Sequence, residues 1–309
     1  MGPADFAPLG TDRRLALQLV KTTVQEPRST LHRLSRDNLA SWYRFRQTHA
    51  TCTICGHRGT LLYELPDATI LGSMRIGILR ETLRCRSCCG KMRDRLMARA
   101  LLDVVEKVCG VRARSIDDLA LVLPDGLRIL DTDANGRIAR RLAHLPGVVV
   151  SLYRPELPSG EDLGDGVVNV DLEQIPFEDG RFDVILTTEV MEHVRFADKA
   201  HAEIARALSP GGHYLFTVPY DETLEHTWQL IDPETDEFLV HPPHMHGDLG
   251  MRDEGIKSYR VFGRDIVDEL GTVGLDTTFR WVDDEASGIF HGDLFVAQKT
   301  AEKVALEKA

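Results

Sequence analysis

Residues 127–137, Leu-Arg-Ile-Leu-Asp-Thr-Asp-Ala-Asn-Gly-Arg, form the stretch that decides the fold. A short apolar run, Leu127–Leu130, predicts a buried strand. Acidic and small residues follow, and they lead into a helical pattern. In doubly wound α/β folds this strand-to-helix turn is where a nucleotide binds. The stretch therefore predicts the first strand of a Rossmann-like sheet with a ligand site at its end.

Short apolar runs continue to alternate with helical stretches toward the C-terminus, which is typical of βαβ units on a mostly parallel sheet. We expect helices at Ala200–Leu208, which ends before Ser209-Pro210-Gly211-Gly212, and at Arg264–Leu270. The seven expected strands are Leu127–Leu130, Val148–Leu152, Gly166–Val170, Phe182–Leu186, His213–Val218, Thr277–Val282 and Asp293–Gln298.

The region before this sheet has a different pattern. Apolar residues at helical spacing over 92–108 predict an amphipathic helix that ends before Gly110 and joins two units. Strand-like pieces precede it at Thr60–Glu64 and Ser73–Leu83. The expected organisation is a helical N-terminal arm (1–50), a zinc ribbon (51–95), connecting helices (96–123), the α/β domain (124–300) with an insertion (220–258), and a tail (301–309).

Four cysteines form two Cys-x2-Cys pairs, Cys52/Cys55 and Cys85/Cys88. Each such turn points two thiolates at one position, and two turns complete the tetrahedral shell that zinc prefers. Four sulfur ligands leave no position for a catalytic water, so we expect a structural zinc. Reduced buried cysteines and a pair of disulfides are the alternatives, and Cys89 could replace Cys88.

Charge is divided unevenly along the chain. Residues 1–115 hold 20 Lys/Arg against 10 Asp/Glu, whereas residues 116–309 hold 17 against 38, which gives the net charge of −11. The basic N-terminal region could bind nucleic acid, or it could offset the charge of a tetrathiolate zinc site. No signal peptide and no run of 18 apolar residues is present, so we expect a cytoplasmic protein without a membrane partner.

Three further stretches add to residues 127–137. Val170–Phe177 follows the third expected strand, Phe182–Val194 covers the fourth strand and its loop, and Ala207–Pro219 contains a Leu-x-Pro-Gly-Gly turn into the fifth. In this order and spacing, the chain from Leu127 to about Lys299 resembles class I S-adenosylmethionine-dependent methyltransferases. The resemblance implies a seven-stranded, mostly parallel sheet with a reversed last strand, and S-adenosylmethionine as cofactor.

The resemblance also implies donor-binding residues, and among them Asp171 would contact the adenine amino group. Two positions depart from the family pattern: Asp133 stands where a glycine is expected, and Leu152 stands where an acidic residue would bind the ribose, with Glu156 as a possible substitute. A domain that has lost its cofactor is therefore an alternative. The implied donor-binding residues are Asp131, Thr132, Asp133, Gly136, Tyr153, Asp171, Leu172, Thr188 and Glu189.

Phe262-Gly263-Arg264-Asp265, together with the cysteine pairs, resembles a methyltransferase-11-like bacterial subgroup that carries an N-terminal four-cysteine zinc ribbon. Many members of that subgroup look like tailoring enzymes of glycans or secondary metabolites. A small-molecule or glycan acceptor is therefore the expected substrate.

Three histidines are candidate general bases, because imidazole has a suitable pKa near neutrality. His193 ends the fourth-strand loop, while His244 and His246 lie in the insertion with His241 and Asp248. His193 could instead be a packing residue, and the insertion cluster could be a second metal site or a solvated loop. The segment from Tyr220 to Ser258 holds ten acidic residues, which disfavours a polyphosphate backbone at the site.

Three functions follow from these features. The first is O-methylation of a small molecule or glycan. The second is methylation of RNA or protein, with the basic zinc-containing region docking the substrate. The third is a non-catalytic Rossmann-like binding protein.

Overall fold

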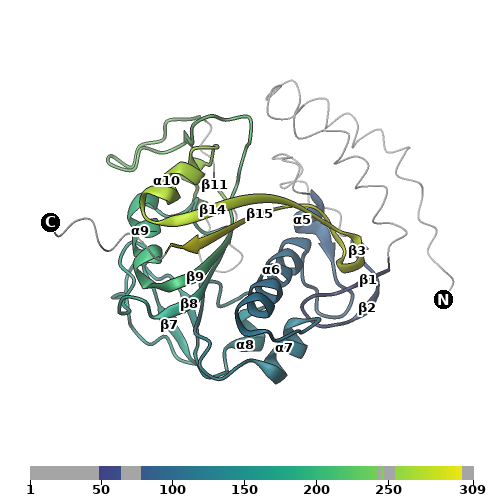
Figure 1. The fold of residues 1–309 in the computed structure, drawn as a ribbon. Coiled ribbons are helices and arrows are strands. Elements are labelled where there is room, and N and C mark those ends of the chain that lie inside the picture. The colour runs from purple at the N-terminus through teal and green to yellow at the C-terminus, as the bar shows by residue number, and fades with distance from the viewer. Residues whose placement is uncertain (1–48, 64–77, 242–244, 247–254, 301–309) are drawn as a thin grey trace, which may run out of the picture.

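The computed structural model describes residues 49–63, 78–241, 245–246 and 255–300. A seven-stranded sheet forms its centre, with the strand order β14-β15-β9-β8-β5-β6-β7 (Figure 1). All pairings from β7 to β9 are parallel, and β15 runs antiparallel to both β9 and β14. The seven strands are β5 (Ile129–Asp131), β6 (Val148–Leu152), β7 (Val167–Asn169), β8 (Phe182–Thr188), β9 (Leu208–Thr217), β14 (Leu275–Asp284) and β15 (Ile289–Lys299). The expected Rossmann-like α/β sheet with a reversed last strand is confirmed.

Strand bounds differ from the expected ones most at β9 and at the last hairpin. β6 has the expected residues, whereas β9 begins at Leu208, within the expected Leu-x-Pro-Gly-Gly turn. β14 is two residues longer than expected at each end, and β15 begins four residues earlier and ends one residue later. The extension has a packing reason, because Ile289 and Phe290 at the start of β15 are buried and α6 packs against this strand. The hairpin thus reaches beyond the sheet and over the N-terminal elements (Figure 1).

The long connecting helix is confirmed as α6 (Met92–Cys109). It begins where the Asp94 carboxylate accepts a hydrogen bond from the Lys91 backbone N–H at 2.9 Å, and it ends at Gly110, whose φ of 69° is easily adopted by glycine. The expected helices near 200 and 264 are α9 (Ala197–Ala207) and α10 (Ile266–Thr272). Two short helices, α7 (Ile116–Val122) and α8 (Ala139–Leu142), pack in the same core as α6.

The prediction of a strand over Ser73–Leu83 is wrong for the described part of that segment. Ile78–Thr82 forms the helix α5, and only Leu83–Arg84 is a strand, β4. The helix buries Leu79 in a small core with Leu83 of β4, Met92 and Phe290. The remaining short elements are β1 (His49–Thr51), β2 (Arg58–Thr60), β3 (Leu62–Tyr63), β10 (Trp228–Gln229), β11 (Met245–His246), β12 (Ile256–Lys257), β13 (Arg260–Val261) and the 3-10 turn η3 (Glu285–Ser287).

Two apolar cores lie on opposite faces of the sheet. One core joins α6 and α7 to the sheet through residues such as Leu101 and Ile129, and the other joins α9 and α10 to it through residues such as Ile204 and Phe216. Cys52, Ile54 and Cys85 belong to the first core. The cysteine-bearing segment, which comprises the described residues 49–63 and 78–91, therefore shares one hydrophobic core with the α/β sheet.

Arg95 on α6 fastens the cysteine-bearing segment to the last hairpin. Its fully buried guanidinium donates to the carbonyls of Leu83 and Gly90 on one side and to those of Ser287 and Gly288 on the other, at 2.7–3.2 Å. A buried charge is tolerated when its donors are satisfied in this way. The bonds tie the second cysteine turn to the turn between β14 and β15.

The helical arm over 1–50 lies outside the described residues except for His49 and Ala50, and the tail 301–309 lies outside them entirely. None of the described helices has the length and apolar character that crossing a membrane would require.

Candidate functional site

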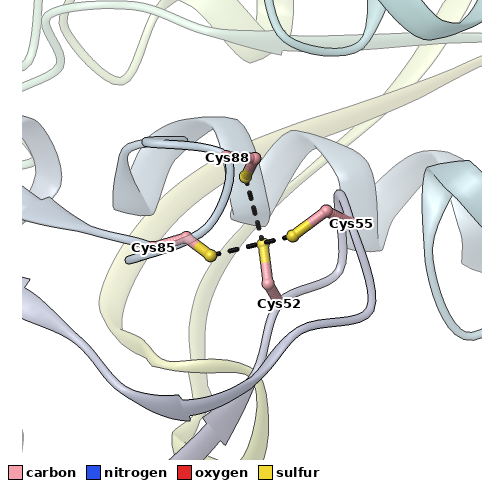
Figure 2. Close-up of side chains that lie close together, drawn as sticks. All are labelled: Cys52, Cys55, Cys85 and Cys88. Atoms are coloured by element: carbon pink, nitrogen blue, oxygen red, sulfur yellow. Dashed lines mark hydrogen bonds between the residues drawn. The ribbon is translucent and has the colours of Figure 1, made fainter.

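The four cysteines converge on one point between two turns (Figure 2). All four Sγ atoms lie within 4.8 Å of one another, and the Cys52–Cys88 and Cys55–Cys85 sulfur pairs are each 3.7 Å apart. No disulfide joins the described cysteines. Four sulfurs around a common centre match the tetrahedral ligand set of a structural zinc site.

Backbone groups around the cluster favour thiolates. The N–H of Ser87 points at Cys85 Sγ and the N–H of Gly90 points at Cys88 Sγ, each at 3.4 Å. Hydrogen bonds from the Cys52 and Cys88 thiols hold the pKa of Cys85 well below its usual range, and the hydrogen bond to Cys85 raises the pKa of Cys52. Cys89 is exposed and takes a φ of 57°, while Cys88 faces the other three sulfurs, so the offset arrangement with Cys89 is not the one formed.

The carboxyl ends of β5 and β8 border a narrow hollow with a cavity volume of about 10 Å³. Four expected donor-binding residues line it: Asp131, Asp133 and Gly136 from the loop after β5, and Thr188 from the end of β8. This is room for about one water molecule, far below the roughly 300–1,000 Å³ of typical ligand pockets. Its other lining residues are Asp94, Met97, Arg137, Ile138 and Leu186, which the sequence patterns did not single out.

Asp131 is the buried carboxyl group of this hollow. Burial, reinforced by the nearby Asp133 and Asp94 carboxylates, raises the pKa of Asp131 to about 7. Its Oδ1 accepts the Asp133 backbone N–H at 3.1 Å, which shapes the loop. A carboxyl group kept in such surroundings gains from a cationic or hydrogen-bond-donating ligand.

Glycine is needed at position 136 because the backbone there passes close to Asp133, and not because of an unusual φ angle. It is absent from the described glycines with positive φ, but a Cβ there would lie 2.7 Å from Asp133 Oδ2 and 2.8 Å from the Asp133 carbonyl oxygen. Thr132 also fixes this loop, because its Oγ1 donates a hydrogen bond to the Leu186 carbonyl oxygen at 3.0 Å. The loop is thus compact despite its single glycine.

The ends of β6 and β7 carry the other expected donor-binding residues. Tyr153 is 55% exposed, Leu172 is buried, and Asp171 accepts the Glu173 N–H in a tight turn. Asn169, which the sequence did not single out, is buried and bonds to the backbone of Arg154, Leu157 and Pro158. It holds the loop after β6 against β7, and these side chains do not line the hollow itself.

Glu189, just after β8, forms an ion pair with Arg80 of α5. The same guanidinium pairs with Asp293 of β15 at 2.7 Å. Burial raises the pKa of Asp293 to about 6, against the opposing effect of Arg80. Arg80 therefore connects α5 to the loop after β8 and to β15, which lie far from it in the sequence.

His193 occupies the same loop with a defined orientation. Its Nδ1 lies 2.7 Å from the Lys257 carbonyl oxygen, so Nδ1 carries the proton, and its Nε2 lies 3.7 Å from the Glu192 carboxylate. Burial lowers the pKa of His193, whereas burial together with the Glu189 charge raises that of Glu192 well above its usual range. The imidazole is therefore neutral near pH 7, as a base must be.

The return segment of the insertion packs against the β8 loop. Arg260 is buried and donates to the carbonyls of Met191, Val194 and Arg195. The Phe262–Asp265 motif anchors the other end, because the Asp265 carboxylate accepts the Thr227 N–H and hydroxyl. His246 is in β11, but only its backbone is described, and His244 and Asp248 lie outside the described residues. The catalytic role of the three histidines stays a prediction.

Comparisons with known proteins agree with this arrangement. A family model described as a methyltransferase domain matches residues 135–216. The "Ubiquinone biosynthesis O-methyltransferase" of Chelativorans sp. is 30% identical over 169 residues, which cover 51% of this chain. The "Ubiquinone/menaquinone biosynthesis C-methyltransferase UbiE" of Idiomarina loihiensis is 26% identical over 154 residues, or 40% of this chain.

The chain covers 66% and 61% of the lengths of these two relatives, slightly less than two thirds of each. Among solved structures, a complex between the Haloferax volcanii Trm112 methyltransferase activator and a methyltransferase is similar to 59% of this chain and 86% of the matched chain. The identity is 16% and the TM-score is 0.37. The family match covers the loop after β5, β6 to β8, α9 and most of β9.

Proposed function

We propose that this chain, which carries a methyltransferase domain, transfers a methyl group from S-adenosylmethionine to a hydroxyl group of a small molecule or glycan. One observation carries the proposal: the loop after β5 lines a hollow at the carboxyl ends of the strands, and the methyltransferase family model begins within that loop. Open α/β sheets bind their ligands at this edge.

The residues present fit the donor. The hollow offers acidic side chains to a ligand with cationic groups, and Asp171 stands two strands away, at the end of β7, for the adenine. S-adenosylmethionine supplies an electrophilic methyl group on a sulfonium, which a bound nucleophile can attack in line. We assign donor binding to Asp131, Thr132, Asp133, Gly136, Tyr153, Asp171, Leu172, Thr188 and Glu189.

The acceptor side lies at the β8 loop and the insertion. When an acceptor oxygen forms its bond to the methyl carbon, it loses a proton, which a neutral histidine can take. His193 is held with its Nδ1 on the Lys257 carbonyl, which leaves Nε2 with a lone pair. His244 and His246 of the insertion are the alternative bases. The O-methyltransferase relative named above supports oxygen as the methylated atom.

Zinc is the metal that the cysteine cluster would hold, through Cys52, Cys55, Cys85 and Cys88. Its role here is structural. The second cysteine turn is bonded to Arg95, which also holds the β14–β15 turn. A bound metal would therefore stabilise the base of α6 and the hairpin packed over it.

Transfer of a labelled methyl group tests the proposal. The zinc-loaded protein is incubated with methyl-labelled S-adenosylmethionine and, in parallel, with catechol-type phenols, oligosaccharides, bulk RNA and bulk protein. We expect label in a phenol or sugar product and none without enzyme. Incorporation into RNA, with salt-sensitive RNA binding, would support the second function, in which the basic N-terminal region docks the substrate.

The third function makes a separate prediction. A non-catalytic binding protein would transfer no label and would bind neither S-adenosylmethionine nor S-adenosylhomocysteine in a calorimetric titration. Binding of S-adenosylhomocysteine without transfer to any of the four acceptor classes would keep the donor site and reject the acceptor assignment.

A further inference from the structure

Arg80 of α5 contacts the first residue of the loop that carries His193. Its Nη2 forms an ion pair with the Glu189 carboxylate, and its Nη1 donates to both carboxylate oxygens of Asp293, at 3.0 and 2.7 Å. α5 lies beside β15, the strand of Asp293 (Figure 1). Because the guanidinium is planar and meets one carboxylate at each Nη atom, its orientation is fixed. Asp293 therefore aims Arg80 at Glu189.

The three charged side chains of this contact are largely buried. That of Arg80 is 13% exposed, and those of Glu189 and Asp293 are similarly covered. Burial disfavours the charge, but the Asp293 and Glu189 carboxylates outweigh burial and raise the pKa of Arg80. Removing one partner of a buried pair leaves the other charge uncompensated, which costs more than at the surface. Loss of Arg80 would leave two carboxylates facing each other.

Glu189 has a backbone conformation that glutamate rarely adopts. Its φ is 54°, in the left-handed region. Such a conformation persists when the surrounding structure fixes it, and it is often found at functional sites. The Glu189 N–H donates to the Thr217 carbonyl at 3.0 Å, and the side chain is held by Arg80. Arg80 thus helps to fix the strained residue at which the loop leaves β8.

The turn after Glu189 ends at the candidate base. The His193 N–H donates to the Val190 carbonyl at 2.9 Å, which makes the turn tight. At its far end the turn is held by the insertion, because His193 Nδ1 donates to the Lys257 carbonyl. At its near end it is held by Arg80 through Glu189. The cysteine-bearing segment and the insertion therefore hold the loop from opposite ends.

We propose that Arg80 is a positioning residue for the loop after β8: it holds Glu189 in the left-handed conformation and so keeps His193 in place for the acceptor. The role toward the acceptor rests on the proposed function. Arg80 acts through Glu189 and is not itself a catalytic residue. The segment between the two cysteine pairs thus takes part in the site by orienting a loop of the methyltransferase domain.

Reaction of His193 with diethyl pyrocarbonate tests the positioning without a substrate. The reagent acylates neutral imidazole, and mass spectrometry of a digest gives the rate at each histidine. In the full-length, zinc-loaded protein His193 should react slowly, because its side chain is 19% exposed and its Nδ1 is bonded. In Arg80→Met its rate should rise about fivefold or more, since the loop opens more often. Arg80→Lys keeps the charge and should give an intermediate rate.

Arg128→Met is the matched control. Arg128 pairs with Asp183 at the opposite end of β8, at 2.7 Å, so this variant also removes an ion pair from that strand. It should leave the His193 rate at the wild-type value. Exposed His144 should react equally in every variant and serves as the internal reference. Thermal melting checks folding, and Arg80→Gln replaces Arg80→Met if that variant does not fold.

Methyl transfer connects the positioning to the reaction. With the acceptor that takes label in the transfer experiment, and at saturating S-adenosylmethionine, Arg80→Met should lower kcat about tenfold or more, because a displaced base loses its alignment. The KM for the acceptor should stay within about twofold of the wild-type value. Arg80→Lys should recover part of kcat, and Arg128→Met should keep the wild-type kcat.

Each outcome decides a separate point. Wild-type reactivity of His193 in Arg80→Met would overturn the inference and leave the proposed function intact, as would an equal rise in Arg128→Met. Faster reaction at His193 with an unchanged kcat would overturn the role toward the acceptor. If no acceptor class takes label, the proposed function fails, and the diethyl pyrocarbonate rates still decide whether Arg80 positions the loop.

Discussion

Asp131 shows how one residue in a proposed binding site can lower the stability of the folded protein. Its carboxyl group is buried next to Asp133 and Asp94, and its pKa is raised to about 7. An unfolded aspartate has a pKa of about 3.9, so the folded state holds a proton that the unfolded state has already released. The stability from this group is therefore present below about pH 4 and is lost as pH rises through about 7.

Asp131→Asn removes that loss, because asparagine does not ionise and its oxygen can still accept the Asp133 N–H. We expect the ligand-free variant to unfold with a higher free energy than the wild type, by roughly 1–3 kcal/mol more at pH 8 than at about pH 5. Urea denaturation at the two pH values measures this. Asp125→Asn, at an exposed position nearby, is the control and should show no pH-dependent gain. A gain of the same size at both pH values would contradict the assignment.

The base assignment also belongs to single residues. If His193 removes the acceptor proton, His193→Ala should lower methyl transfer by about 100-fold or more and leave S-adenosylhomocysteine affinity unchanged. The double variant His244→Ala/His246→Ala is its counterpart in the insertion. Full turnover in the His193 variant with loss only in the double variant would place the base in the insertion instead.

Elements differ in how much of them the sequence could predict. The strands from β5 to β9, α6 and α9 follow from apolar periodicity and from turn residues, because burial at one face repeats with the period of each element. α5 could not be predicted, since five residues are too few for a helical pattern and its Leu79 is buried against residues from other elements, Leu83, Met92 and Phe290. Its Arg80 then meets Glu189 and Asp293, a contact that no local pattern encodes.

The candidate site divides in the same way. Cysteine spacing predicted the sulfur cluster, because ligand geometry is local to two turns. Asp131, Asp133, Gly136 and Thr188 were expected from motif order and do line the hollow. Asp94 was missed because, read locally, an acidic residue in the first turn of a helix is a cap. Only the packing of α6 over the sheet brings it to the hollow.

Substituting two of the four clustered cysteines tests whether a bound metal stabilises α6 and the sheet. Purified protein should hold about one zinc per chain, and Cys52→Ser/Cys85→Ser should lose it, since a tetrahedral shell needs all four sulfurs. We expect the melting temperature to fall by several degrees, because Cys52 and Cys85 belong to the core shared with the sheet. Elemental analysis and thermal melting give the two readouts.

Cys89→Ser is the matched control, because Cys89 is exposed and lies outside the sulfur cluster. It should keep both the zinc and the melting temperature. Zinc-free wild-type protein prepared without chelators, or full zinc content in the double variant, would refute the metal assignment.

At the scale of the whole molecule, the described cysteine turns and the α/β sheet pack as one unit. The apolar core runs from the cysteine turns into the sheet, Arg95 and Arg80 bridge the two, and α6 contributes to the hollow. These contacts favour a structural role for the cysteine-bearing segment, which is one of the two roles, structural or docking, that the sequence left open.

A crystal structure of the zinc-loaded protein with S-adenosylhomocysteine tests this account most directly. It should show the ligand at the carboxyl ends of the parallel strands, next to Asp131 and Thr188 and with its adenine toward Asp171, and a metal among the four cysteines. A ligand bound elsewhere, or a cysteine cluster without metal, would contradict the account.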